Sequence, residues 1–142
     1  MRRVADEREG EPFSSLLQDE RYVTKIAYPQ LLFIQMQRVM DALRAGGDGL
    51  EELENLKALL LSSWRQEINE KLNGAEKAMR RRLAKLQKLK SRLGTATFRE
   101  ARRRVVVEYV RAYVQKVVEK LDEVGLLLVE EHRVLRGGGL VE

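Results

Sequence analysis

The chain has 142 residues, of which 44% are hydrophobic and 35% charged, a composition typical of one soluble, folded domain. It contains no cysteine, which excludes disulfides, thiolate zinc sites and cysteine nucleophiles and predicts an intracellular protein, cytoplasmic or nucleoid-associated. No apolar run approaches the about 20 residues that span a bilayer, so we expect no membrane association, and the abundant Glu, Arg and Lys suit a thermophile.

The net charge of +5 conceals an asymmetry along the chain. Residues 77–104 hold twelve Lys and Arg side chains and a single acid, Glu100. The remainder holds fifteen bases and twenty-one acids, so one segment makes an otherwise acidic protein basic.

Three regions are predicted from the pattern of polar and apolar residues. Residues 1–13 are charged and lack periodicity, which predicts a flexible N-terminal tail. Residues 14–125 form the predicted helical domain. Residues 126–142 combine a short apolar run with "GGG" and are expected to be a short extended segment and tail, with a possible small β remnant.

The helical domain opens with two short signals. Ser14 or Ser15 suits the N-cap of a short helix. Pro29 then fits the first turn of a second helix, which the glycine-rich "AGGDG" at 45–49 ends.

An unusually long apolar stripe follows, stepping by threes and fours with an average close to the helical period of 3.6. Its members are Leu50, Leu53, Leu56, Leu60, Trp64, Ile68, Leu72, Ala75, Met79, Leu83, Leu86, Leu89 and Leu93. The stripe predicts one central helix roughly 65 Å long, opened by a capping box of Asp48 and Glu51. Because the stripe keeps phase across Asn73-Gly74, we expect that dipeptide to ride inside the helix or to bend it mildly.

The last long helix is predicted from Phe98 to Val124, with Thr97 and Glu100 as a second capping box and Gly125 as its C-cap. The fold class is therefore all-α, an elongated bundle of three to four helices with one very long central helix. The residues expected to hold the bundle together are Met36, Met40, Leu53, Leu56, Leu60, Trp64, Ile68, Leu72, Tyr109, Tyr113 and Val117.

The basic segment is the candidate binding surface. Its bases avoid the apolar stripe, and like charges at i,i+4 repel, which indicates compensation from outside the helix. The predicted contact residues are Lys77, Arg80, Arg81, Arg82, Lys85, Lys88, Arg92, Arg99, Arg102, Arg103 and Arg104. Duplex nucleic acid, bound without base readout, an acidic protein surface, and a second copy whose acidic half-helix meets the basic one are the three open partners.

No motif for catalysis or metal binding is found. His132 is the single histidine and makes a poor metal site alone, and no dinucleotide, phosphate-loop or nucleophile-elbow pattern occurs. Carboxylate pairs such as Glu51/Glu54 lie among bases and are interpreted as solvated helix faces. We therefore expect no enzyme, catalytic residue, metal or cofactor.

Three stretches, "IAYPQLLFIQMQRVMDAL" at 26–43, "LENLKALLLSSWRQEINEKL" at 53–72 and "TFREARRRVVVEYVRAYVQ" at 97–115, follow one another in order. Together they resemble the helical domain of GINS subunits, archaeal and eukaryotic replication factors that join the replicative helicase. The resemblance covers about residues 14–124 and implies a non-enzymatic scaffold in a complex with helicase and a RecJ-like partner. The chain departs from that family in its basic extension and in lacking a clear β-rich domain.

The sequence as a whole predicts a non-enzymatic helical assembly protein acting at nucleic acid, as a homo- or hetero-oligomer. The alternatives are an architectural or coat-type protein that sheathes duplex nucleic acid, and a coiled-coil adaptor whose basic helix docks an acidic partner.

Overall fold

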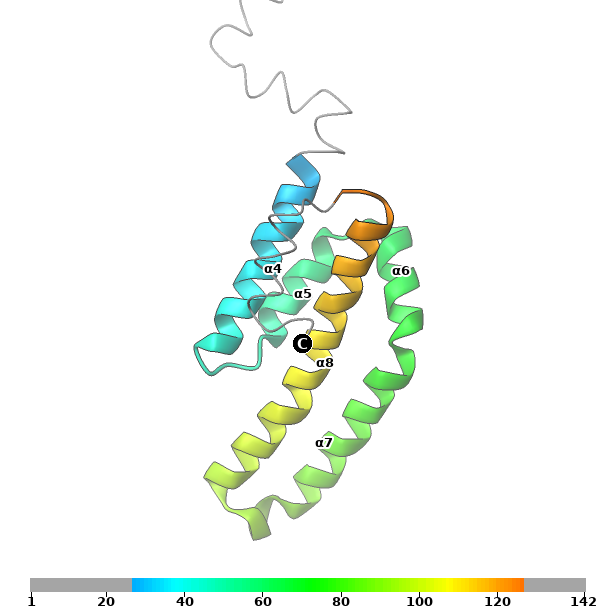
Figure 1. The fold of residues 1–142 in the computed structure, drawn as a ribbon. Coiled ribbons are helices and arrows are strands. Elements are labelled where there is room, and N and C mark those ends of the chain that lie inside the picture. Colours follow the sequence, from blue (N-terminus) through cyan, green and yellow to red (C-terminus); the bar gives the residue numbers. More distant parts are fainter. Residues whose placement is uncertain (1–26, 127–142) are drawn as a thin grey trace, which may run out of the picture.

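The computed structural model describes residues 27–126, which form five α-helices and no strand (Figure 1). The helices are α4 (Tyr28–Arg44), α5 (Leu50–Leu59), α6 (Ser62–Lys71), α7 (Asn73–Leu93) and α8 (Thr95–Glu123). The all-α prediction is confirmed for this part of the chain. The predictions for residues 1–13, for a helix from Ser14 or Ser15 and for residues 127–142 fall outside the described residues.

The helices form two regions (Figure 1). α4 packs against α5, and α4, α5 and α6 each pack against α8. α7 runs back along the N-terminal part of α8, and this pair projects away from the other helices. We call α7 with residues 95–105 the arm, and the rest of the described chain the body.

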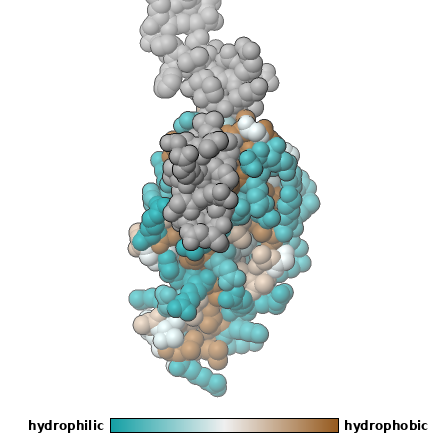
Figure 2. All heavy atoms as spheres, in the orientation of Figure 1, coloured by the Kyte–Doolittle hydropathy of each residue, from teal (hydrophilic) through white to brown (hydrophobic). Residues whose placement is uncertain are grey.

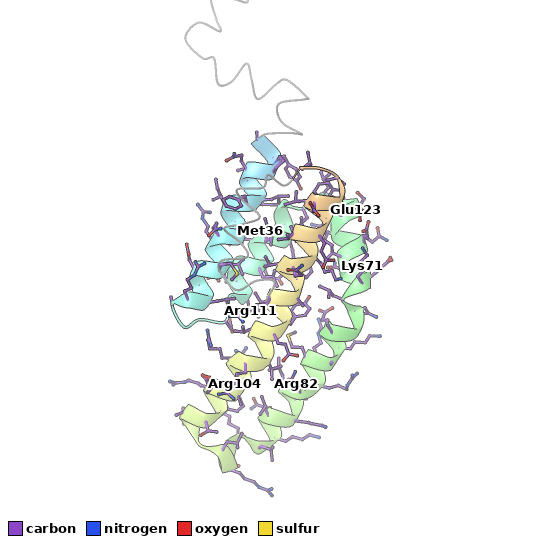
Figure 3. The ribbon with its side chains drawn as sticks, in the orientation of Figure 1. Met36, Lys71, Arg82, Arg104, Arg111 and Glu123 are labelled. Atoms are coloured by element: carbon purple, nitrogen blue, oxygen red, sulfur yellow. The ribbon has the colours of Figure 1, made fainter. Side chains whose placement is uncertain are left out.

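The core of the body is continuous from α4 to α8. Buried side chains on α4 recur every three or four residues, as on one face of a helix, and Met36 points from it toward α8 (Figure 3). Every residue predicted for the core is buried except Trp64, which is only half-buried beside Tyr28. Burying each large apolar side chain stabilises the fold by about 1.5–3 kcal/mol, so this core dominates the stability of the body.

The valines of α8 illustrate how packing overrides propensity. Seven valines between Val105 and Val118 would disfavour an isolated helix, yet all seven are buried in α8. Their burial against the body outweighs a propensity cost of a few tenths of a kcal/mol each.

The single long helix expected over residues 50–93 is not what the structure shows. The chain becomes extended at Leu60 and Leu61, with ψ values of 145° and 143°, and so separates α5 from α6. The Tyr28 hydroxyl satisfies the backbone there, donating to the carbonyl of Leu59 at 2.7 Å and accepting from the N–H of Leu61 at 2.9 Å. The apolar stripe conceals this break because Leu60 itself is buried, at 4% exposure, and keeps the helical spacing.

The second boundary, at Leu72, is only a bend. The N–H of Leu72 bonds to the Ile68 carbonyl at 3.0 Å, and its own carbonyl accepts from Glu76 at 2.8 Å. Helical hydrogen bonding therefore runs from α6 into α7, and Gly74 lies inside α7. The mild kink expected at Asn73-Gly74 occurs one residue earlier.

The glycine signals are accurate and the capping boxes are not. Gly125 has φ +74° and ends α8, with the Leu126 N–H bonded to the Leu121 carbonyl at 2.8 Å, as predicted. α8 begins at Thr95, so Thr97 lies inside it and caps nothing. At the start of α5 the N-cap is Gly49, and Asp48 only accepts from the Leu50 N–H at 3.0 Å.

In the described part of the chain, no helix combines the length and apolar character needed to cross a membrane.

Candidate nucleic-acid interface

The arm is thin because only two helices build it. Met79, Leu83, Leu86 and Leu93 face α8 along an apolar seam, but each is only half-buried. Within the described structure α7 has no fully buried side chain. Nearly all charged groups on the arm are therefore in solvent.

Five bases form one face of α7. At about 100° per residue, Lys77, Arg81, Lys85, Lys88 and Arg92 fall within about 80° of the helix circumference, on the side away from Leu83 and Leu86. All five are exposed, and they extend over about 22 Å of helix. We call these five residues the outer stripe. None of them forms an ion pair with another of the residues described here.

Three more predicted contact residues, Arg80, Arg82 and Arg104, each form one exposed ion pair. The pairs are Arg80–Glu76 at 2.7 Å, Arg82–Glu108 at 3.2 Å and Arg104–Glu100 at 3.3 Å. Exposed pairs are worth about 0–1 kcal/mol, so these arginines stay available to a stronger anion. Arg82 and Arg104 lie at the same height of the arm on opposite helices (Figure 3).

Arg102 and Arg103 have an intramolecular role that the sequence did not reveal. The guanidinium of Arg103 donates to the carbonyls of Leu43 at 2.9 Å, Gly46 at 2.8 Å and Gly47 at 3.0 Å, where α4 ends. Arg102 pairs with Asp48 at 3.2 Å. Both arginines therefore fasten the turn between α4 and α5 to α8, and a cation at a helix C-terminus also suits the helix dipole.

The tip of the arm carries the remaining bases. Gly94 joins α7 to α8 in a single residue with φ +82°. Arg99 is exposed just beyond this turn, and Lys90 lies over the ring of Phe98, 5.2 Å from its centroid. Phe98 is the one aromatic residue of the arm and is occupied by that contact, so the arm lacks a stacking platform for unpaired bases.

Several acids of the body pair with cations of the body, and within residues 27–126 none pairs with the outer stripe. Lys120 on α8 bonds Glu67 on α6 at 2.9 Å and Glu123 at 3.1 Å, and Lys71 bonds Glu67 at 3.1 Å. Hydrogen bonds from Lys120 and Lys71 lower the pKa of Glu67, and the hydrogen bonds that Lys120 makes to Glu67 and Glu123 raise the pKa of Lys120. Within residues 27–126, the positive charge on the outer face of the arm is therefore not neutralised by an ion pair.

A cleft of about 570 Å³ lies where α5, α6 and α7 meet, and it was not predicted from the sequence. Lys57 is its most enclosed cation, donating to the Tyr109 hydroxyl at 3.3 Å and lying 4.9 Å from the ring centre of Tyr113. Burial opposes the charged form, but Tyr109 and Glu54 outweigh burial and raise the pKa of Lys57. The sequence did contain one indication of this cleft, because Lys57 directly follows Leu56 of the apolar stripe and a lysine so close to a core position is often partly enclosed.

Acids, bases and amides share the walls of this cleft, so it favours no ligand of one charge. Across residues 27–126, no three His, Cys, Asp or Glu side chains are grouped closely enough to hold a metal ion. Comparison with protein-family models, curated proteins and solved structures finds no match to this chain.

Proposed function

We propose that this chain is a non-enzymatic assembly protein that binds duplex nucleic acid, without reading its sequence, through the outer stripe of α7. The observation that supports the proposal is the absence of any ion pair from all five stripe residues within residues 27–126. Within residues 27–126, every acid that forms an ion pair does so with a base outside the outer stripe. The outer stripe is therefore the described surface on which we expect a polyanion to bind most strongly.

The spacing of the stripe suits a phosphate backbone. Neighbouring stripe residues are three or four positions apart, which is about 4.5–6 Å along the helix axis. A stripe of about 22 Å laid along a duplex spans about six base-pair steps, since each strand has one phosphate per 3.4 Å of the duplex axis. Each Lys or Arg placed on a phosphate releases condensed counterions, and that release drives binding.

A duplex suits the arm better than a single strand. Single-strand sites add aromatic side chains on which bases stack, and the one aromatic residue of the arm lies against Lys90. The stripe contains only Lys and Arg, which supply many phosphate contacts, and it lacks the Asn, Gln, Asp and Glu side chains that read adenine and cytosine edges.

A projecting arm on a packed body favours a scaffold that holds nucleic acid at a distance from its other contacts. The resemblance to GINS subunits implies a non-enzymatic scaffold in a multi-subunit complex, and a scaffold that binds nucleic acid would be nucleoid-associated. A coat-type protein would use the same stripe but would bind in many copies along a duplex.

Fluorescence anisotropy of the full chain with duplexes of two unrelated sequences, and with one matched single strand, tests the proposal. We expect equal affinity for the duplexes, weaker binding to the single strand, and a steep loss of affinity between about 50 and 200 mM salt. Saturation at one or two copies per short duplex supports a scaffold, and dense coverage supports a coat. No binding at the lowest salt would reject the proposal.

A further inference from the structure

A second surface of the arm is apolar and open. A groove of about 340 Å³ runs between α7 and α8. Its floor includes Leu86, Leu89 and Val105, and its rim includes Arg82, Lys85 and Arg104. Leu89 is 39% exposed although it belongs to the helical seam, and Figure 2 shows hydrophobic surface among hydrophilic side chains over the arm.

Among the described residues the groove is open because no third helix covers the arm, whereas the body has several helices on α8. In the body, α4, α5 and α6 all cover α8, so its valines are buried there. Along the arm, α7 is the one helix of residues 27–126 that covers α8, and the leucines between the two helices are partly exposed. A third amphipathic helix lying in the groove would complete the packing.

We propose that this groove binds an amphipathic, acidic helix of a partner protein. The positive charge around the groove favours an acidic partner. Three bases rim an apolar floor, in a segment whose twelve bases are accompanied by the single acid Glu100. A helix with leucines at i, i+3 or i+4 and i+7 places its apolar side on the floor, while flanking Glu or Asp side chains reach the rim.

The rim arginines are free to accept such acids. The pairs of Arg82 with Glu108 and of Arg104 with Glu100 are exposed, and exposed pairs exchange at little cost. A guanidinium offers two parallel donors to one carboxylate, which makes arginine the better rim residue for acidic side chains. Lys85, which has no ion pair among the described residues, adds a third positive point.

Two other occupants fit less well. A second copy offers α5 as its acidic helix, but Leu53 and Leu56 of α5 are fully buried in the body and cannot enter a groove. Nucleic acid would bring bases or phosphates onto an aliphatic floor, where neither finds a stacking or hydrogen-bonding partner.

The test uses a fluorescent synthetic peptide of about 18 residues with leucines at i, i+3 and i+7, glutamates on both flanks and alanines elsewhere. A control peptide has the same composition with the leucines dispersed around the helix. We expect saturable binding of the first peptide to the full chain, and binding of the control at least about tenfold weaker.

Two matched pairs of variants locate the site. Leu89→Gln should weaken peptide binding about tenfold, whereas Leu31→Gln, at an exposed leucine of α4, should not change it. Lys85→Glu should weaken binding more than Lys77→Glu, which alters net charge equally but lies away from the groove. Circular dichroism of each variant shows that the fold is retained.

Equal binding of the two peptides would overturn the proposal, because attraction would then be charge alone. Unchanged peptide binding by Leu89→Gln would also overturn the proposal. So would sedimentation equilibrium that shows a dimer of the unchanged chain and a monomer of Leu89→Gln, because a second copy would then occupy the groove. Leu89→Gln carries no charge change and should leave duplex binding intact, so this proposal and the nucleic-acid proposal fail independently.

Discussion

Removing part of the outer stripe should change how duplex binding depends on salt. With all five residues on phosphates, the log–log slope of affinity against salt is about −4.5, from about 0.9 per contact. Replacing Lys77, Arg81 and Lys85 by Gln leaves two contacts and a slope of about −1.8. Between about 50 and 200 mM salt, affinity should then fall about 12-fold rather than about 500-fold.

The fold should survive these changes because all three side chains are exposed and without ion pairs to residues 27–126. Anisotropy titrations at four or more salt concentrations give the slope directly. A control with Arg44, Lys71 and Arg111 changed to Gln removes the same charge from exposed positions in the body and should keep a slope near that of the unchanged chain. Equal slopes for the stripe variant and the control would refute the reasoning.

Arg103→Gln should destabilise the protein by about 1.5–3 kcal/mol in urea unfolding, because the charged guanidinium that bonds three carbonyls at the end of α4 is lost. Arg104→Gln, which loses one exposed ion pair, should change stability by no more than about 0.5 kcal/mol, and an equal effect of both would contradict the role of Arg103. Gly94→Ala should lower the melting temperature through a backbone cost of about 1–3 kcal/mol, since φ is +82° there and no atom lies within 4 Å of an added Cβ; an unchanged melting temperature would mean that the arm turn relaxes. Hydrogen bonds from Lys120 and Lys71 hold the pKa of Glu67 below its ordinary 4.5, so the stability they add is present above that pH and is lost as pH falls through the lowered value. Lys120→Met should reduce the loss of unfolding free energy at acid pH. An unchanged loss in this variant would mean that other carboxylates cause it.

Much of the body was predictable because its core follows a local rule. Leu53, Leu56 and Ile68 are buried in the structure and fall on the stripe that helical periodicity identifies. Gly125 ends its helix for a reason that is equally local, its freedom to adopt positive φ.

What escaped prediction depends on contacts between distant residues. The break at Leu60 is stabilised by the hydroxyl of Tyr28, and no local pattern indicates that pairing. Arg103 looks like any other base of its segment, yet its partners are backbone carbonyls more than fifty residues earlier. The sequence located the charge of the candidate site, but only the fold separates bases engaged inside the protein from those that form the outer stripe.

The most direct test of the central claim is a nitrogen-15 chemical-shift map of the labelled full chain on addition of a short duplex. The account predicts that the largest shifts fall within residues 77–92 of α7, with smaller ones at the arm tip near Arg99 and none along α4 and α5. Shifts concentrated on the body, or a saturated complex whose α7 resonances do not move, would contradict it.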